Sequence, residues 1–266
     1  MKALFIGDIV GKPGRKVVKK FLPDFIASGV HIIVANGENA AGGSGLTPRI
    51  VTELFNAGID VLTSGDHVFR NRDVLEIVDT EERLLRPMNL SDRAKGFGFG
   101  VFDKDGVPFA VANFIGRVFL GGANCPFASA DQFLVEVDAK AIVRFVDMHA
   151  EATSEKVAMG RYLDGRATAV FGTHTHVQTA DEQVLEKGTA YITDLGMTGP
   201  FDSVLGREVK PVLESFLTGM PHRFDVSKND PRLSGAPIEF DESTGRANAI
   251  RRIHLRENDE LPQMEM

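Results

Sequence analysis

Short apolar runs alternate with amphipathic segments over the first 80 residues. Runs at residues 2–6, 31–35 and 60–63 predict buried strands, and the segments after them predict helices at 15–26, 48–57 and about 73–78. Thr47 and Pro48 are suited to the cap and first position of the second helix. Gly11 and Gly14 predict a loop before the first helix. Strands separated by helices favour right-handed βαβ units and a parallel sheet.

The pattern changes after residue 95. Apolar runs at 96–102 and 107–114 flank Asp105-Gly106, which predicts a hairpin. Further strands are predicted at 143–148, 167–171 and 189–194, helices at 153–163 and 207–217, and a second hairpin from 238–240 and 247–255. We expect an α/β fold in which two mixed β-sheets pack face to face with helices outside. Residues 1–266 are expected to form a single domain, with the polar segment 257–266 as a frayed tail.

Polar residues with metal-ligand chemistry follow five of the predicted strands. They are Asp8, the pair Glu38 and Asn39, the pair Asp66 and His67, His149, and the pair His174 and His176. In open α/β sheets, ligands bind outside the carboxyl ends of the strands. A mononuclear site needs three or four protein ligands, so the set is large enough for two ions bridged by Glu38.

Each residue also has a structural interpretation when it is considered alone. Asp8 could cap a turn, Glu38 could be a surface carboxylate, and His149 could be a hydrogen-bonded core histidine. His67 could be a further ligand or a proton donor next to the metals. The recurrence of such residues at five strand ends favours metal ligation by Asp8, Glu38, Asn39, Asp66, His149, His174 and His176.

The order Gly-Asp, Gly-Glu-Asn, Gly-Asp-His, a lone His and then Gly-Thr-His-Thr-His resembles the calcineurin-like metallophosphoesterases. The chain is similar to their bacterial YmdB-like branch along nearly its whole length, with supporting stretches at residues 37–43, 149–156 and 198–203. The resemblance implies the calcineurin-like fold and a phosphodiesterase acting on 2′,3′-cyclic nucleotides. It also implies two divalent or trivalent transition-metal ions, iron or manganese, with zinc as a further option.

One position departs from that family, which usually has Gly-Asn-His where this chain has Gly65-Asp66-His67. The added negative charge is expected to tighten metal binding and to make the metal pair a poorer Lewis acid. The resemblance assigns His67 as the catalytic acid near the leaving oxygen, while a metal-bridging hydroxide attacks phosphorus. Asp66 is expected to be out of hydrogen-bonding reach of the adjacent His67, so that this imidazole needs a separate partner.

The composition of the chain limits the classes of partner that it is expected to bind. The formal net charge of −7 argues against binding to duplex nucleic acid but permits a small anionic substrate beside metal cations. A single cysteine, the lack of an apolar stretch of membrane-spanning length and the lack of a signal-peptide pattern lead us to expect a cytoplasmic protein. Two alternatives stay open: a phosphomonoesterase or other metallohydrolase, and a metal-bound regulator of RNA processing that acts through a protein partner. The sequence does not fix the oligomeric state.

Overall fold

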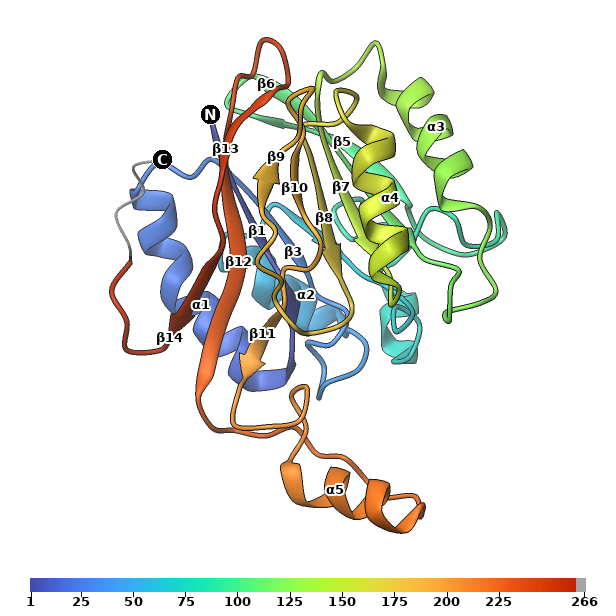
Figure 1. Ribbon diagram of the computed structural model, residues 1–266, viewed down its shortest axis with the longest axis vertical. Helices are drawn as coiled ribbons and strands as arrows, with labels where there is room; N and C mark the ends of the chain where they lie inside the picture. Colours follow the sequence, from blue (N-terminus) through green and yellow to red (C-terminus); the bar gives the residue numbers. More distant parts are fainter. Residues whose placement is uncertain (262–266) are drawn as a thin grey trace.

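Two β-sheets pack face to face between two layers of helices in the computed structural model, which describes residues 1–261 (Figure 1). Of the predicted tail 257–266, residues 262–266 lie outside the described residues. In the described part of this tail, Glu257 pairs with Lys16 at 2.6 Å and Leu261 packs against the core. None of the helices in residues 1–261 has the length and apolar character needed to cross a membrane.

The first sheet is mixed and carries the order β2-β11-β12-β1-β3-β4, with β13 and β14 also paired to β12. Its strands are β1 (Lys2–Ile6), β2 (Asp8–Ile9), β3 (Ile32–Asn36), β4 (Val61–Thr63), β11 (Met197–Pro200), β12 (Pro231–Phe240), β13 (Ala247–Ile250) and β14 (Ile253–Arg256). Parallel pairing of β1 with β3 and of β3 with β4 confirms the predicted βαβ units. β12 runs antiparallel to β1, so the C-terminal part of the chain pairs with the first strand.

The second sheet has the order β5-β6-β7-β8-β10-β9. Its strands are β5 (Phe99–Lys104), β6 (Val107–Ile115), β7 (Val143–His149), β8 (Ala169–Thr173), β9 (Gln183–Val184) and β10 (Ala190–Ile192). The predicted hairpin is confirmed, because β5 and β6 pair directly across Asp105-Gly106. Both turn residues have positive φ, of 54° and 82°, as a two-residue hairpin turn requires.

Helices cover the outer face of each sheet (Figure 1). The described helices are α1 (Gly11–Ala27), α2 (Pro48–Asn56), α3 (Pro126–Val137), α4 (Thr153–Leu163) and α5 (Val209–Thr218), with a 3₁₀ helix at Arg72–Glu76, and the first four form these covering layers. α1 and α2 pack on the first sheet, and α3 and α4 pack on the second. α5 extends away from the sheets, and its Phe216 and Leu217 are exposed.

Strand alternation explains why both faces of each sheet are buried. In β1, Leu4 and Ile6 belong to the core beneath α1 and α2, whereas Ala3 and Phe5 belong to the core between the sheets. The Phe5 ring meets two rings of the opposite sheet, stacked on Phe171 at 4.3 Å and edge-on to Phe145 at 5.1 Å. This central core fixes the sheets together directly behind the ends of β3, β7 and β8.

Two sequence predictions about elements were wrong, and one helix was missed. Gly11 and Gly14 lie inside α1 rather than in a loop. A Cβ on Gly14 would lie 2.3 Å from the Thr198 carbonyl oxygen, so this glycine allows the helix to approach β11 closely. The helix expected at about 73–78 is a 3₁₀ helix, and the sequence patterns had not indicated α3.

Candidate active site

The carboxyl ends of strands from both sheets meet at one edge and bring the candidate ligands together. The first sheet supplies Asp8 on β2, Glu38 and Asn39 from the turn after β3, and Asp66 and His67 from the turn after β4. The second sheet supplies His149 as the last residue of β7, and His174 and His176 from the loop after β8.

A compact group of four ligand atoms belongs to Glu38, Asp66, His149 and His174, and these atoms all lie within 4.8 Å of one another. The buried His149 is its centre. His149 Nε2 lies 3.3 Å from Glu38 Oε1, 3.1 Å from Asp66 Oδ1 and 3.0 Å from His174 Nδ1. Two carboxylates and two imidazoles at this spacing match the donor set of a transition-metal site.

The polar network behind His149 fixes which nitrogen faces this group. Thr173 Oγ1 donates a hydrogen bond to Asp147 Oδ1 at 2.7 Å, so it accepts one from His149 Nδ1 at 2.9 Å. Asp147 Oδ2 also accepts from Thr63 Oγ1 at 2.5 Å. With a proton held on Nδ1, His149 turns Nε2 towards the carboxylates, which is the orientation of a metal-bound histidine.

A second group lies on the other side of Glu38 and contains Asp8, Asn39 and His176. Asn39 Nδ2 lies 3.2 Å from Glu38 Oε1 and 3.2 Å from His176 Nε2, and His176 Nε2 lies 3.9 Å from Asp8 Oδ1. Asp8 Oδ2 accepts from the His174 amide at 3.0 Å, whereas Asp8 Oδ1 is buried without a hydrogen-bond partner among the described residues. A buried carboxylate oxygen without a donor is the kind of atom that a cation satisfies.

The pKa shifts in both groups indicate an environment that favours bound cations. Burial alone would lower the pKa of His149, but Glu38, Asp66 and Asp8 around it raise that pKa well above its ordinary value. Burial raises the pKa of Asp8, against the opposing effects of His176 and His149. The concentrated carboxylates therefore favour positive charge at this edge, and a metal that binds there displaces protons. The residues of the first group fit a metal ion, and the unpartnered oxygen of Asp8 lies close to that group.

His67 has the separate partner that was predicted for it. Its Nδ1 lies 2.9 Å from Asn39 Oδ1, an oxygen that only accepts, so Nδ1 carries a proton. Its Nε2 lies 3.4 Å from Asp66 Oδ2, which is an ion-pair distance but not a hydrogen bond. Because the chain turns sharply after β4, the neighbouring side chains fold towards each other. The imidazole is one-third exposed, as a residue that meets substrate would be.

The histidine loop after β8 is held by a buried ion pair that the sequence patterns had not indicated. Lys156 Nζ donates to Asp194 Oδ2 at 2.5 Å, and both side chains are buried. The same carboxylate oxygen accepts from Thr175 N at 3.2 Å and from Thr175 Oγ1 at 2.8 Å. Thr175 separates two residues with positive φ, His174 at 98° and His176 at 64°, so Asp194 fixes a strained loop. The available signal was a lysine on the apolar face of a predicted helix.

Gly65 is needed because the turn after β4 lies directly against a ligand. A Cβ on Gly65 would come within 2.1 Å of His149 Nε2. No larger residue fits unless the imidazole moves. Next to the histidine loop, a cavity of about 620 Å³ is lined by His176, Phe201, Leu205, Arg252 and His254, among others.

Comparison with known proteins agrees with the geometry. A sequence model of the YmdB-like protein family matches residues 4–253. The chain is 44% identical to the 2′,3′-cyclic-nucleotide 2′-phosphodiesterase of Bacillus subtilis strain 168, over 97% of this chain and 98% of that protein. It is similar to the crystal structure of a hypothetical protein from Thermus thermophilus, with a TM-score of 0.91 and 40% identity over 96% of this chain and 99% of the other. A crystal structure described as a novel phosphatase from Mycoplasma pneumoniae gives a TM-score of 0.91 at 32% identity, over 96% and 93% of the two chains. The fold, the converging ligands and these similarities over almost the full length show that the chain belongs to the YmdB-like family.

Proposed function

We propose that the protein is a dinuclear metal-dependent phosphodiesterase that hydrolyses 2′,3′-cyclic nucleotides. The observation that supports this proposal is the position of Glu38 between two groups of candidate ligand residues, Asp66, His149 and His174 in one and Asp8, Asn39 and His176 in the other. The 2′,3′-cyclic-nucleotide activity named for the Bacillus subtilis relative supports the choice of substrate. We propose iron or manganese as the metals and the cytoplasm as the location, since imidazole and carboxylate ligands suit both ions.

When bound, the metals would supply Lewis acidity and make a water nucleophilic at neutral pH. The protein's own residues orient the candidate ligands and supply the proton for the leaving group. Thr173 and Asp147 keep His149 Nε2 turned inward, and Asp194 holds the loop that presents His174 and His176. His67 is the general acid in this proposal. With one proton committed to Asn39, its Nε2 can hold a second proton beside the Asp66 carboxylate and donate it to the departing ribose oxygen.

The cavity beside His176 suits the nucleoside part of the substrate. Phe201 offers an aromatic edge, and the Arg252 side chain offers donors to a base or to phosphate. A cyclic phosphodiester fits this arrangement because its phosphate can face the metals while the base extends into the cavity. A phosphomonoester would place more negative charge at the metals.

The test begins with elemental analysis of protein purified without chelators or a histidine tag. We expect about two transition-metal ions per chain. The metal-loaded protein should hydrolyse 2′,3′-cyclic AMP faster, by kcat/KM, than it hydrolyses 4-nitrophenyl phosphate. Metal-free protein that takes up no manganese, iron or zinc would overturn the proposal, as would loaded protein that leaves the cyclic substrate intact.

Glu38→Gln tests the bridging role, because it keeps the shape of the side chain and removes its charge. We expect the variant to lose both ions together. Glu136→Gln on the exposed face of α3 is the matched control and should keep both ions. Two tightly bound ions in Glu38→Gln would exclude Glu38 as the bridge.

A further inference from the structure

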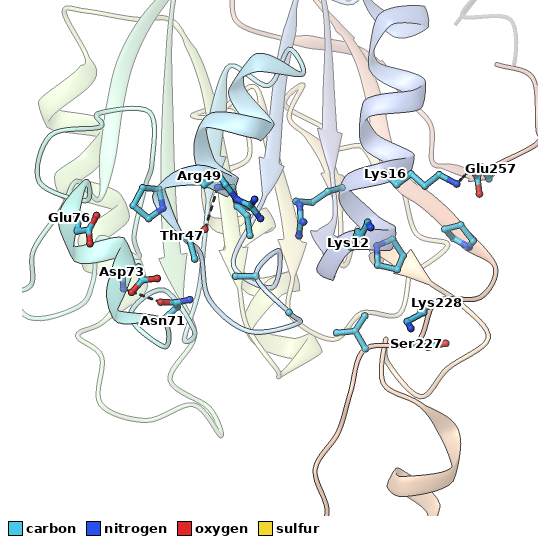
Figure 2. Close-up of a pocket in the computed structure, with 18 residues that line it drawn as sticks. Lys12, Lys16, Thr47, Arg49, Asn71, Asp73, Glu76, Ser227, Lys228 and Glu257 are labelled. Carbon is cyan, nitrogen blue, oxygen red and sulfur yellow. Dashed lines mark hydrogen bonds and ion pairs between the residues drawn. The ribbon is translucent and has the colours of Figure 1, made fainter.

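A second cavity, with a volume of about 1120 Å³, lies between the N-terminal ends of α1 and α2 (Figure 2). Five of its lining residues are basic: Lys12, Arg15, Lys16, Arg49 and Lys228. None of the seven predicted metal ligands lines it, so it is distinct from the site described above. Its volume is large enough for a nucleotide-sized molecule.

Three of the five cations have their charge free for a ligand. Arg15 pairs with Glu53 at 3.2 Å, and Lys16 pairs with Glu257 at 2.6 Å. Within residues 1–261, by contrast, the side chains of Lys12, Arg49 and Lys228 make no hydrogen bond or ion pair. Cations that line one cavity without ion-pair partners repel one another, and an anion would relieve this repulsion.

Two of these three cations lie at helix N-termini, where positive charge is least favourable. Lys12 lies in the first turn of α1 and Arg49 in the first turn of α2, and neither turn contains an acidic residue. The positive end of the helix dipole disfavours a cation there, so these residues weaken their helices slightly. The same dipoles favour a phosphate in front of both helices. The positions of Lys12 and Arg49 therefore destabilise the free protein slightly, whereas they would stabilise a complex with an anion.

The opposite wall of the cavity has a different character. Figure 2 shows Asn71, Asp73 and Glu76 at the far end from Lys12 and Lys228. These side chains present carbonyl and carboxylate oxygens, which accept hydrogen bonds from hydroxyl and amino groups. A ligand that spans the cavity therefore has an anionic end and an end rich in donors.

We propose that this cavity binds a nucleoside phosphate, with its phosphates at Lys12, Arg49 and Lys228 and its ribose and base towards Asn71 and Asp73. The site adjoins the metal ligands through the backbone. Gly11 N donates to Asn39 O at 3.0 Å, and Arg15 Nη1 donates to Ala40 O at 2.5 Å. An occupant in front of α1 therefore contacts the helix that anchors the segment after Glu38, outside the group of candidate metal ligands.

Lysine labelling read by mass spectrometry tests binding at this location on the metal-loaded protein. With ADP as the probe, acylation of Lys12 and Lys228 should slow about fivefold or more, while the exposed Lys210 on α5 reacts as before. Adenosine without phosphate should give no protection. Unchanged labelling of Lys12 and Lys228 at saturating ADP would overturn the proposal. Equal protection by pyrophosphate at the same concentrations would overturn the nucleoside part of it.

A matched pair of double variants separates this cavity from general charge effects. In Lys12→Gln/Arg49→Gln, the ADP concentration that half-protects Lys228 should rise about tenfold or more. The control Arg93→Gln/Lys140→Gln removes the same charges from exposed positions outside the cavity and should leave that concentration unchanged. An equal shift in both double variants would contradict the site. The readout is local protection, so it is independent of whether the protein hydrolyses cyclic nucleotides.

Discussion

Asp66 Oδ2 lies 3.4 Å from His67 Nε2. The other oxygen of the same carboxylate lies 3.1 Å from His149 Nε2, inside the group of ligand atoms. One aspartate therefore joins the proposed metal centre to the proposed general acid. An asparagine at this position would retain the ligand oxygen but would place a neutral amide beside His67.

Asp66→Asn is expected to weaken metal binding at least about tenfold, because it removes one unit of negative charge at short range. The measurement is a metal titration of the chelator-stripped protein. Asp105→Asn is the control, since this residue sits at an exposed hairpin turn with positive φ, where asparagine is well tolerated. Equal metal affinities in the two variants would argue against ligation by Asp66.

His67→Ala should lower kcat for 2′,3′-cyclic AMP by about 10²–10⁴-fold while the metal content stays unchanged. A phosphodiester with a 4-nitrophenolate leaving group needs little protonation, so its hydrolysis should fall much less. The comparison of the two substrates in one variant identifies the acid role. Equal losses on both substrates would instead assign His67 to binding or to positioning.

Gly65→Ala is expected to displace His149 and to reduce the metal content, because the added Cβ would meet His149 Nε2 at 2.1 Å. Gly106→Ala is the comparison, since its Cβ meets nothing within 4 Å and the only cost is a positive φ of 82°. That cost is about 1 kcal/mol in unfolding free energy, with no loss of metal. Elemental analysis and thermal unfolding of both variants check the prediction.

Lys156→Met should destabilise the fold by about 3–5 kcal/mol, because it leaves Asp194 buried without its cation. The exposed Lys140→Met should change the unfolding free energy by less than about 0.5 kcal/mol. Denaturant unfolding measures both. Besides Thr175, the Gly196 amide also donates to Asp194, at 2.7 Å. A loss of only that size in Lys156→Met would show that these donors suffice to stabilise the Asp194 carboxylate.

Metal removal should also lower stability. Ligands from both sheets converge on the centre, so metals that bind only the folded chain add about 2.7 kcal/mol of unfolding free energy at 100 times their dissociation constant. The expected result is a lower Tm after chelation that recovers when manganese or iron is restored. An unchanged Tm would show that the ligands hold their positions without a cation.

Most strands and helices that depend on local sequence patterns were predicted correctly. The strands before Asp8, Glu38, Asp66, His149 and His174 were predicted because buried parallel strands are continuous apolar runs that end in polar turns. Thr47 was predicted as a helix cap and accepts from the Ile50 amide at 3.4 Å. The resemblance of the motifs to the YmdB-like family is confirmed by the family match over residues 4–253. The roles given to individual site residues stay predictions.

Features that depend on distant contacts were not predicted. Lys156 and Asp194 are 38 residues apart, and nothing local shows that they meet under the histidine loop. Gly14 was predicted as a loop residue. The structure requires a glycine there because α1 approaches Thr198, which is distant in the sequence. Asp66 and His67 face each other because of the tight turn after β4, whereas an extended chain would point them apart.

The place of β12 in the first sheet has a consequence for how the protein matures. Residues 231–240 pair with β1, yet they are made more than 220 residues after it. During synthesis, Asp8, Glu38 and Asp66 leave the ribosome long before the three histidines of the second sheet, and β1 lacks this neighbour until nearly the whole chain has emerged. All seven candidate ligands have been made once residue 176 has emerged, well before β12 begins at Pro231. The sheet that carries Asp8, Glu38 and Asp66 therefore gains its central antiparallel strand only after every candidate ligand has been made.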